Sequence, residues 1–252
     1  ETADHAKRLV TTSPVLSYRK LNSILNNPYF ESAEINLSFN DNSNLQAELK
    51  KLQDEVVRKV KKGASIIHLI EDLPKQGSLP INALLAVGSV HQRLVKLGLR
   101  SDANIIVTTS SARDTHQIAC LIGFGATAVY PTLAYQTILD LTDRNELKGD
   151  AHENCSRYRK GINKGLLKII SKMGISTISS YRGSQLFEIV GLDKDVVDLC
   201  FTNTESRIKG KKFKDLDLEL RSLNEYARSN IADMKVGGLL KYIHGGEYHT
   251  YN

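Results

Sequence analysis

The feature that most constrains the fold is a repeated alternation between short β-branched runs and amphipathic helical segments. Five runs are typical of buried strands: Glu34–Phe39, Ser65–Ile70, Ala103–Val107, Ala126–Tyr130 and Ile175–Ser179. Apolar residues at helical spacing follow each of the first four runs. Because strand–helix–strand units of this length place their strands side by side and parallel, the alternation predicts an α/β fold built from parallel β/α repeats.

The intervening segments predict eight helices. Their expected bounds are Asn44–Lys62, Pro80–Leu97, Ser111–Ile122, Thr132–Leu141, His152–Lys172, Gly183–Val190, Asp193–Cys200 and Leu216–Ser229. Ser111 and Asp114 have the spacing of a capping box at the start of one helix. Gly161 and Gly165 lie four residues apart inside the longest helix, where each glycine costs about 1 kcal/mol relative to alanine. A neighbouring element is therefore expected to pack closely against both.

Five strands are too few for a closed eight-stranded barrel. Two arrangements remain open: a doubly wound open sheet, or a cut barrel. The helix that ends in Gly123-Phe124-Gly125 before a strand of small residues favours the second arrangement. We therefore expect an incomplete TIM-barrel-like fold.

Composition excludes several classes of function. The 252 residues are 41% hydrophobic and 25% charged, which is ordinary for a globular chain. The net charge is +6, the lysines are scattered and the chain has no tryptophan, so nucleic-acid binding is not expected. No apolar run is long enough to cross a membrane. The 3 cysteines are widely spaced, which argues against a zinc or iron–sulfur site in this chain and favours a reducing compartment.

Parallel α/β proteins carry their chemistry at the carboxyl ends of the strands. Here those ends offer two acids, Glu71 and Asp72, and the pair Tyr181 and Arg182. Arg182, Gly183 and Ser184 would open a helix, whose free amide groups could hold an anion. We take these six residues as candidates for anion or interdomain contacts: Glu71, Asp72, Tyr181, Arg182, Gly183 and Ser184.

No catalytic, cofactor-binding or metal-binding residue is predicted. The chain has no phosphate-binding loop, no dinucleotide fingerprint and no nucleophile elbow. Its seven histidines have no metal-ligand spacing, and His68, inside an apolar strand, is expected to be a hydrogen-bonded core residue.

Several phrases nevertheless resemble the large chains of glutamate synthases, and they occur in the order of that family. They read HAKRLVTTSPVLS (5–17), LPINALLAVGSVHQRLVKLGLR (79–100), GFGATAVYPTLA (123–134), KGLLKIISKMGISTISSYRGSQLFEIVGL (164–192), FTNTESRIKG (201–210) and HGGEYHTYN (244–252). The segment 164–192 is the strongest evidence for this resemblance, because the match is long and free of gaps and its amino-acid sequence is unusual.

The resemblance implies the central domain of such an enzyme over residues 1–243, with the FMN-binding synthase domain beginning at 244–252. That central domain is a reduced relative of the FMN-binding barrel. The full enzyme is an oxidoreductase that makes two L-glutamate from L-glutamine and 2-oxoglutarate, using FMN and an iron–sulfur cluster. This segment would link the amidotransferase and synthase domains of the same polypeptide and help to enclose the ammonia tunnel, without a cofactor of its own. The isolated segment is expected to be inactive.

The resemblance also implies partners and a location. The full enzyme takes electrons from ferredoxin or from a small subunit that uses NAD(P)H, and it works in the cytoplasm or the plastid stroma. None of the catalytic residues of the family falls on this chain. Asn203 stands where the family usually has glycine, and Lys209-Gly210-Lys211-Lys212 replaces an apolar stretch.

Two other functions stay open. One is a stand-alone β/α-barrel enzyme that binds a phosphorylated metabolite, with Arg182–Ser184 facing the same cavity as Glu71 or Asp72. The other is an interaction scaffold, in which the lysines of 209–214 dock an acidic partner such as ferredoxin.

Overall fold

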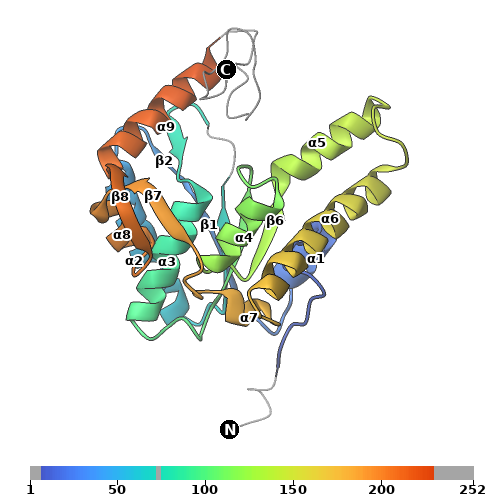
Figure 1. Ribbon diagram of the computed structural model, residues 1–252, viewed down its shortest axis with the longest axis horizontal. Coiled ribbons are helices and arrows are strands. Elements are labelled where there is room, and N and C mark those ends of the chain that lie inside the picture. The colour runs from blue at the N-terminus through green and yellow to red at the C-terminus, as the bar shows by residue number, and fades with distance from the viewer. Residues whose placement is uncertain (1–6, 72–74, 230–252) are drawn as a thin grey trace.

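The centre of the molecule is a sheet of four parallel strands (Figure 1). The computed structural model describes residues 7–71 and 75–229. The strands stand in chain order: β1 (Ser32–Asn36), β3 (Ile66–Ile70), β5 (Asn104–Thr109) and β6 (Ala128–Pro131). Beyond β6, the N-terminal segment adds one parallel bridge between Val15 and Val129. A doubly wound sheet reverses its strand order at a switch point, so an order without reversal is that of a barrel segment.

Three helices connect the successive strands. They are α2 (Leu45–Lys61), α3 (Ala83–Lys96) and α4 (Thr115–Gly123). Strand residues of one parity, such as Ile67, Ile105 and Val129, join the main hydrophobic core with these helices. Their neighbours of the other parity, Ile66 and Ile106, form a second core with α1 (Tyr18–Leu25). The sheet is therefore covered by different layers on its two faces, and among the described residues it does not close.

Two long helices form a hairpin that projects from one side of the sheet (Figure 1). They are α5 (Thr132–Asp143) and α6 (Ala151–Lys172). A Cβ atom placed on Gly165 would lie 2.6 Å from the Thr115 side chain, so α6 packs closely on the start of α4 there. Nothing lies within 4 Å of the same position on Gly161. The expected close approach is confirmed at Gly165 and wrong at Gly161.

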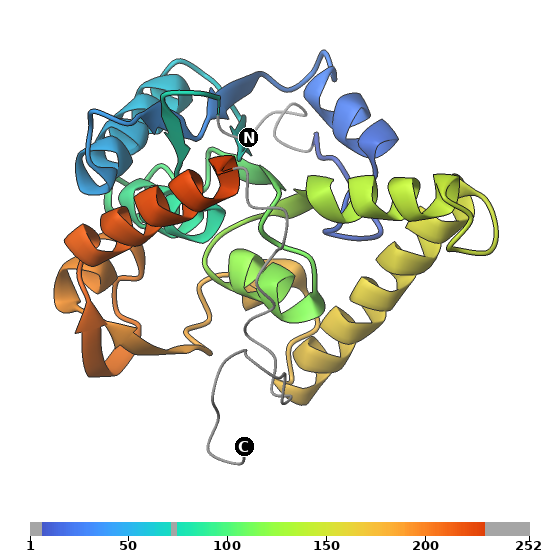
Figure 2. The same cartoon turned by 90° about the horizontal axis from the view of Figure 1, so that it is seen from above.

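The C-terminal part of the described chain consists of α7 (Ile178–Tyr181), β7 (Glu188–Leu192), α8 (Lys194–Cys200), β8 (Glu205–Lys211) and α9 (Phe213–Arg228). In this part, α7 packs against α4, α8 against α3 and α9 against α2 (Figure 2). Strands β7 and β8 are parallel, and α8 connects them. A Cβ atom on Gly88 of α3 would lie 2.2 Å from the carbonyl oxygen of Cys200, so α3 and α8 touch through backbone.

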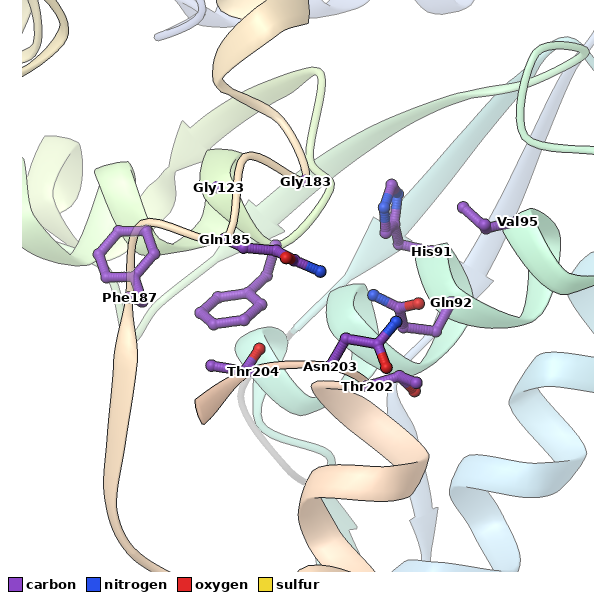
Figure 3. A pocket seen from close by; sticks show the side chains of 11 residues that line it. His91, Gln92, Val95, Gly123, Gly183, Gln185, Phe187, Thr202, Asn203 and Thr204 are labelled. Atoms are coloured by element: carbon purple, nitrogen blue, oxygen red, sulfur yellow. The ribbon is translucent and has the colours of Figure 1, made fainter. Parts of the chain in front are cut away.

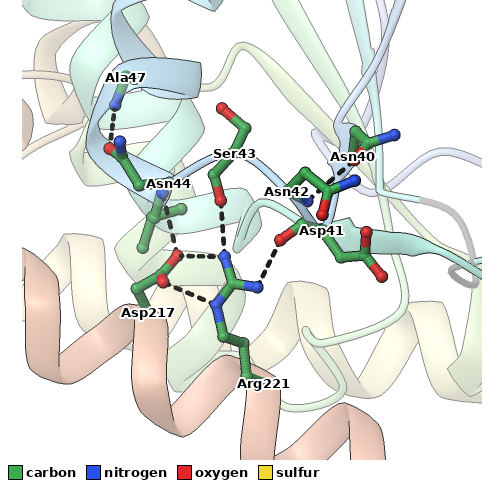
Figure 4. A network of polar contacts seen from close by, with 9 residues as sticks. Asn40, Asp41, Asn42, Ser43, Asn44, Ala47, Asp217 and Arg221 are labelled. Carbon is green, nitrogen blue, oxygen red and sulfur yellow. Dashed lines mark hydrogen bonds and ion pairs between the residues drawn. The ribbon is translucent and has the colours of Figure 1, made fainter.

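Hydrogen bonds from an ion pair within α9 fix that helix to the corner that precedes α2 (Figure 4). Arg221 Nε donates to Asp217 Oδ2 at 2.8 Å, and its Nη atoms donate to the carbonyl oxygens of Asp41 and Ser43. Asp217 Oδ1 in turn accepts from the backbone N–H of Leu45, the first residue of α2, at 3.0 Å. This corner also holds the small antiparallel pair β2 (Ser38–Asn40) and β4 (Ser78–Pro80).

The structure corrects three expectations from the sequence. Residues 175–179 form no strand, because Thr177 caps the short helix α7 instead. Residues 183–190 form no helix; they are an irregular loop that leads into β7. The capping box of α4 is Asp114 with Gln117, not Ser111 with Asp114.

Candidate functional site

Glu71 follows β3 directly and lies at the carboxyl end of the sheet, as expected. Its side chain is buried, with 7% exposed. Oε1 accepts from the N–H of Ala83, the first residue of α3, at 3.1 Å. Oε2 accepts from Ser111 Oγ at 2.8 Å and from the backbone N–H groups of Ser110 and Ser111 at 3.2 Å each. The Thr109 hydroxyl also donates to Oε2.

This carboxylate joins three segments: the end of β3, the start of α3 and the loop between β5 and α4. A negative group at a helix N-terminus is favourable, and its charge is compensated by the surrounding donors. Since both oxygens are already engaged, Glu71 is a structural residue that holds the strand ends together. Asp72 lies outside the described residues.

The other candidates lie at the opposite end of the sheet. Tyr181 is buried, which raises the pKa of its phenol. Arg182 donates to the Thr127 hydroxyl at 2.8 Å, immediately before β6 begins. The Gly183 N–H donates to the carbonyl of Gly123, and the Ser184 hydroxyl donates to the carbonyl of Tyr181. Because no helix starts at Gly183, the amide groups on which the expected anion site depended are not arranged as a helix N-terminus.

Arg182 instead belongs to a basic cluster with His91, which is buried, and Arg100, which like Arg182 is half-buried. Arg100 Nε donates to His91 Nδ1 at 2.9 Å, and Arg100 Nη2 donates to the carbonyl of Gly125 at 2.9 Å. Burial, followed by the positive charges of Arg100 and Arg182, lowers the pKa of His91 to about 4. Burial and then Arg182 lower the pKa of Arg100 to about 10. His91 is therefore neutral at pH 7.

A cavity of about 240 Å³ adjoins this cluster; we call it the His91 cavity. Figure 3 shows the amides of Gln92, Gln185 and Asn203 around one space, although they come from α3, the loop before β7 and the turn after α8. Aromatic rings of Phe124 and Phe187 also line it. No pattern in the sequence predicted this cavity. The one sequence signal close to the cavity was Asn203, which stands where the family that this sequence resembles usually has glycine.

A polar line crosses the sheet face that packs on α1. His68 Nδ1 lies 3.3 Å from Glu34 Oε1, and His68 Nε2 lies 2.7 Å from Thr108 Oγ1. The His68 ring is 4% exposed, and burial lowers its pKa, partly offset by Glu34. The expectation of a hydrogen-bonded core histidine is confirmed. Glu34 and Thr108 were not anticipated, since only the register of β1, β3 and β5 brings them to His68.

The described residues include neither a membrane-spanning helix nor a cluster of metal ligands. No helix there is long and apolar enough to span a membrane. No group of three or more histidine, cysteine, aspartate or glutamate side chains there is placed to hold a metal ion.

Comparison with known proteins gives one consistent result. The sequence profile of the glutamate synthase central domain matches residues 1–193. The chain is 34% identical to the glutamate synthase [NADPH] large chain of Bacillus subtilis over 252 aligned residues, which covers 98% of this chain and 16% of the relative. It is 34% identical to the ferredoxin-dependent glutamate synthase 1 of Arabidopsis thaliana, covering 99% of this chain and 16% of the relative.

A further relative, the ferredoxin-dependent glutamate synthase of Cyanidium caldarium, is 44% identical over 184 residues, which cover 68% of this chain and 12% of the relative. Among solved structures, the flavin-binding domain of baker's yeast flavocytochrome b2 is similar over 78% of this chain and 46% of its own, with 12% identity and a TM-score of 0.41. The chain thus spans about a sixth of the length of the first relatives it matches. With the profile covering most of its residues, this chain belongs to the glutamate synthase central domain family.

Proposed function

We propose that this chain acts as the connecting domain of a longer glutamate synthase polypeptide. It would hold an amidotransferase domain and an FMN-binding synthase domain at a fixed separation and enclose part of the path of ammonia between them. The observation that carries the proposal is the match of the central-domain profile to residues 1–193, together with relatives that are about six times longer.

The structure supports a geometric role rather than a catalytic one. Glu71, the acidic candidate described at the carboxyl end of the sheet, has both oxygens engaged by the protein itself. The Ser110 and Ser111 N–H groups, which could otherwise meet a flavin phosphate, donate to that carboxylate. The strand ends around Glu71 therefore do not fit an FMN phosphate, and no step of the reaction is assigned to them. We place FMN and the iron–sulfur cluster in other parts of the polypeptide.

The finer features follow from the same proposal. We place the domain boundary at 243/244, inside the segment that the structure does not describe. Electrons would come from ferredoxin or from a small subunit that uses NAD(P)H, in the cytoplasm or the plastid stroma. Asp72 and the exposed parts of 182–184 would contact neighbouring domains.

The alternative of a stand-alone barrel enzyme gains no support. It required Arg182–Ser184 to face the same cavity as Glu71 or as Asp72, which lies outside the described residues. Arg182 bonds to Thr127 before β6, whereas Glu71 follows β3, so they lie at opposite ends of a parallel sheet.

The connecting role is tested by the coupling of two activities in the full-length polypeptide that contains this chain. Arg221→Met removes the contacts that fix α9 to the corner before α2. We expect glutamine-dependent glutamate formation to fall severalfold, while ammonia-dependent formation changes little. Only glutamine-dependent formation needs ammonia to pass between two domains that are held at a fixed separation. Arg207→Met, on the exposed face of β8, is the matched control.

Equal loss of both activities would contradict the role. So would copurification of stoichiometric FMN with the 252-residue chain alone, since the proposal expects that chain to be inactive and colourless.

A further inference from the structure

The buried ring of His91 presents a hydrogen-bond donor to the His91 cavity. Only 9% of His91 is exposed. Its Nδ1 accepts from Arg100 Nε, and arginine is always a donor. Because the pKa of His91 is lowered to about 4, the ring is neutral at pH 7 and its one hydrogen sits on Nε2. Nε2 has no hydrogen-bond partner in the part of the chain that is described, and it lies 3.6 Å from the Cβ position of Gly183, at the cavity wall.

The backbone around the cavity is held in unusual conformations. Gln185 and Asn203 both have positive φ, 55° and 66°, and both line the cavity. The only other described non-glycine residue with positive φ is Asn145, in the distant turn between α5 and α6. Residues other than glycine adopt this region at an energetic cost, and such positions cluster at ligand sites.

The charge near the cavity is positive and lacks an acidic partner. No aspartate or glutamate is among the residues that line it. The Arg100 guanidinium is satisfied by His91 and by the carbonyls of Ala103 and Gly125, so no carboxylate neutralises it in the described chain. The two guanidinium charges are opposed by the C-terminal ends of α3, α4 and α8, each equivalent to roughly −0.5 of a charge. The balance suits one negative charge rather than two.

We propose that the His91 cavity binds a small carboxylate. The Nε2–H of His91, the Asn203 amide and the Thr204 hydroxyl would donate to its oxygens, while Arg182 supplies charge from behind the Gly183 turn. A phosphate dianion fits less well, because phosphate sites use helix N-termini or arginine forks, and helix C-termini border this cavity. The site goes beyond the connecting role and does not depend on it.

The test is a titration followed by NMR of the 252-residue chain labelled with ¹⁵N-histidine. Sodium acetate, inorganic phosphate and sodium chloride are compared at matched ionic strength. We expect acetate to shift the His91 Nε2 resonance saturably and more tightly than phosphate, with no saturable effect of chloride. Tighter binding of phosphate, or a response to acetate that matches chloride, would overturn the proposal.

A matched pair of variants separates the site from the fold. Asn203→Gly removes the cavity amide at a position whose φ suits glycine, and Asn145→Gly makes the same change in a remote turn. We expect Asn203→Gly to weaken acetate binding about fivefold, as for one lost hydrogen bond, and Asn145→Gly to leave it unchanged. Equal affinities for the two variants would refute the assigned contacts.

The carboxylate could come from a free small molecule or from an acidic side chain elsewhere in the longer polypeptide. The same titration on the full-length polypeptide distinguishes them. If acetate still shifts His91, the ligand is a free carboxylate. If His91 already resonates at the bound position and acetate has no effect, a side chain of the polypeptide occupies the cavity. A resonance at the free position that does not respond to acetate contradicts both.

Discussion

The carboxylate of Glu71 accepts hydrogen bonds from the start of α3 and from the loop after β5. Replacing it by glutamine keeps the shape but turns an NH₂ group toward backbone N–H donors, whichever way the amide is oriented. Leaving buried donors unpaired costs about 1–3 kcal/mol, and more for a charged partner. We therefore expect Glu71→Gln to lower the free energy of unfolding by about 3 kcal/mol in urea titrations.

The control is Glu225→Gln, the same change on the exposed part of α9. Its free energy of unfolding should stay within about 0.5 kcal/mol of the wild type. If the two substitutions cost the same, Glu71 does not hold the strand ends together.

The lowered pKa of His91 leads us to expect that the free energy of unfolding depends on pH. Its pKa is lowered to about 4 in the folded protein, from 6.5 in the unfolded chain. Between these values the unfolded chain binds the extra proton, so stability rises with pH through this window. The contribution is complete above about pH 6.5 and is lost as the pH falls toward 4.

The measurement is urea unfolding at several pH values for the wild type and His91→Gln. His68, whose pKa is also lowered, adds a slope of the same sign to both proteins. The difference between them isolates His91, and we expect the wild type to lose more stability on acidification, by an amount on the order of 3 kcal/mol. Parallel pH profiles would contradict the buried neutral ring.

At the level of elements, two glycines inside helices should respond oppositely to the same substitution. Gly88→Ala places a Cβ atom 2.2 Å from the Cys200 carbonyl oxygen, so α8 must move away from α3. Gly161→Ala meets nothing within 4 Å and gains helix propensity. We expect Gly88→Ala to destabilise the protein by about 2 kcal/mol and Gly161→Ala to stabilise it by up to about 1 kcal/mol.

Thermal and urea unfolding of both variants check this pair. A Gly88→Ala protein as stable as Gly161→Ala would mean that α3 and α8 do not meet through backbone.

The elements also show what sequence reasoning reaches. The four strands of the parallel sheet could be predicted, because buried parallel strands are continuous β-branched runs. The run 34–39, expected as one strand, is however divided between β1 of this sheet and β2 of the small antiparallel pair. The run at 175–179 has the same composition, yet local hydrogen bonding decides its form: Thr177 Oγ1 accepts from the Ser180 N–H and starts a helical turn. Composition cannot separate these outcomes when a capping residue lies inside the run.

The candidate sites were harder to predict than the elements. Glu71 was placed correctly at a strand end, but its engagement depends on serines about 40 residues later. The His91 cavity joins residues from α3, α4, the loop before β7 and the turn after α8. No local sequence pattern predicts that these residues line one cavity, because their proximity depends on how α8 packs on α3.

At the scale of the whole molecule, α9 is tied to the sheet layers by Arg221 and Asp217. Both side chains are partly buried, 30% and 17% exposed, so their ion pair is screened less than a surface pair. We expect Arg221→Met and Asp217→Asn each to cost about 1–2 kcal/mol. The double variant should cost about 1 kcal/mol less than the sum, because the two residues act together.

Hydrogen exchange locates the effect. Amides of α9 should lose protection in each variant, whereas those of β3 and β5 keep theirs. Simple additivity of the two substitutions would mean that Arg221 and Asp217 hold α9 to the corner before α2 independently, and it would contradict the expected coupling between the two side chains.

The same contact has a consequence for the order of events during synthesis. Leu45, at the start of α2, is bonded to a residue 172 positions later in the chain. At about 5–20 residues per second, the ribosome delivers that partner roughly 10–30 s after α2 emerges. The β/α units pair with their neighbours in chain order and can assemble as they are synthesised. The hydrogen bond from the Leu45 N–H at the start of α2 forms only after α9 has been synthesised. The nascent chain therefore passes through a state in which the sheet is formed and one corner is still open to chaperones.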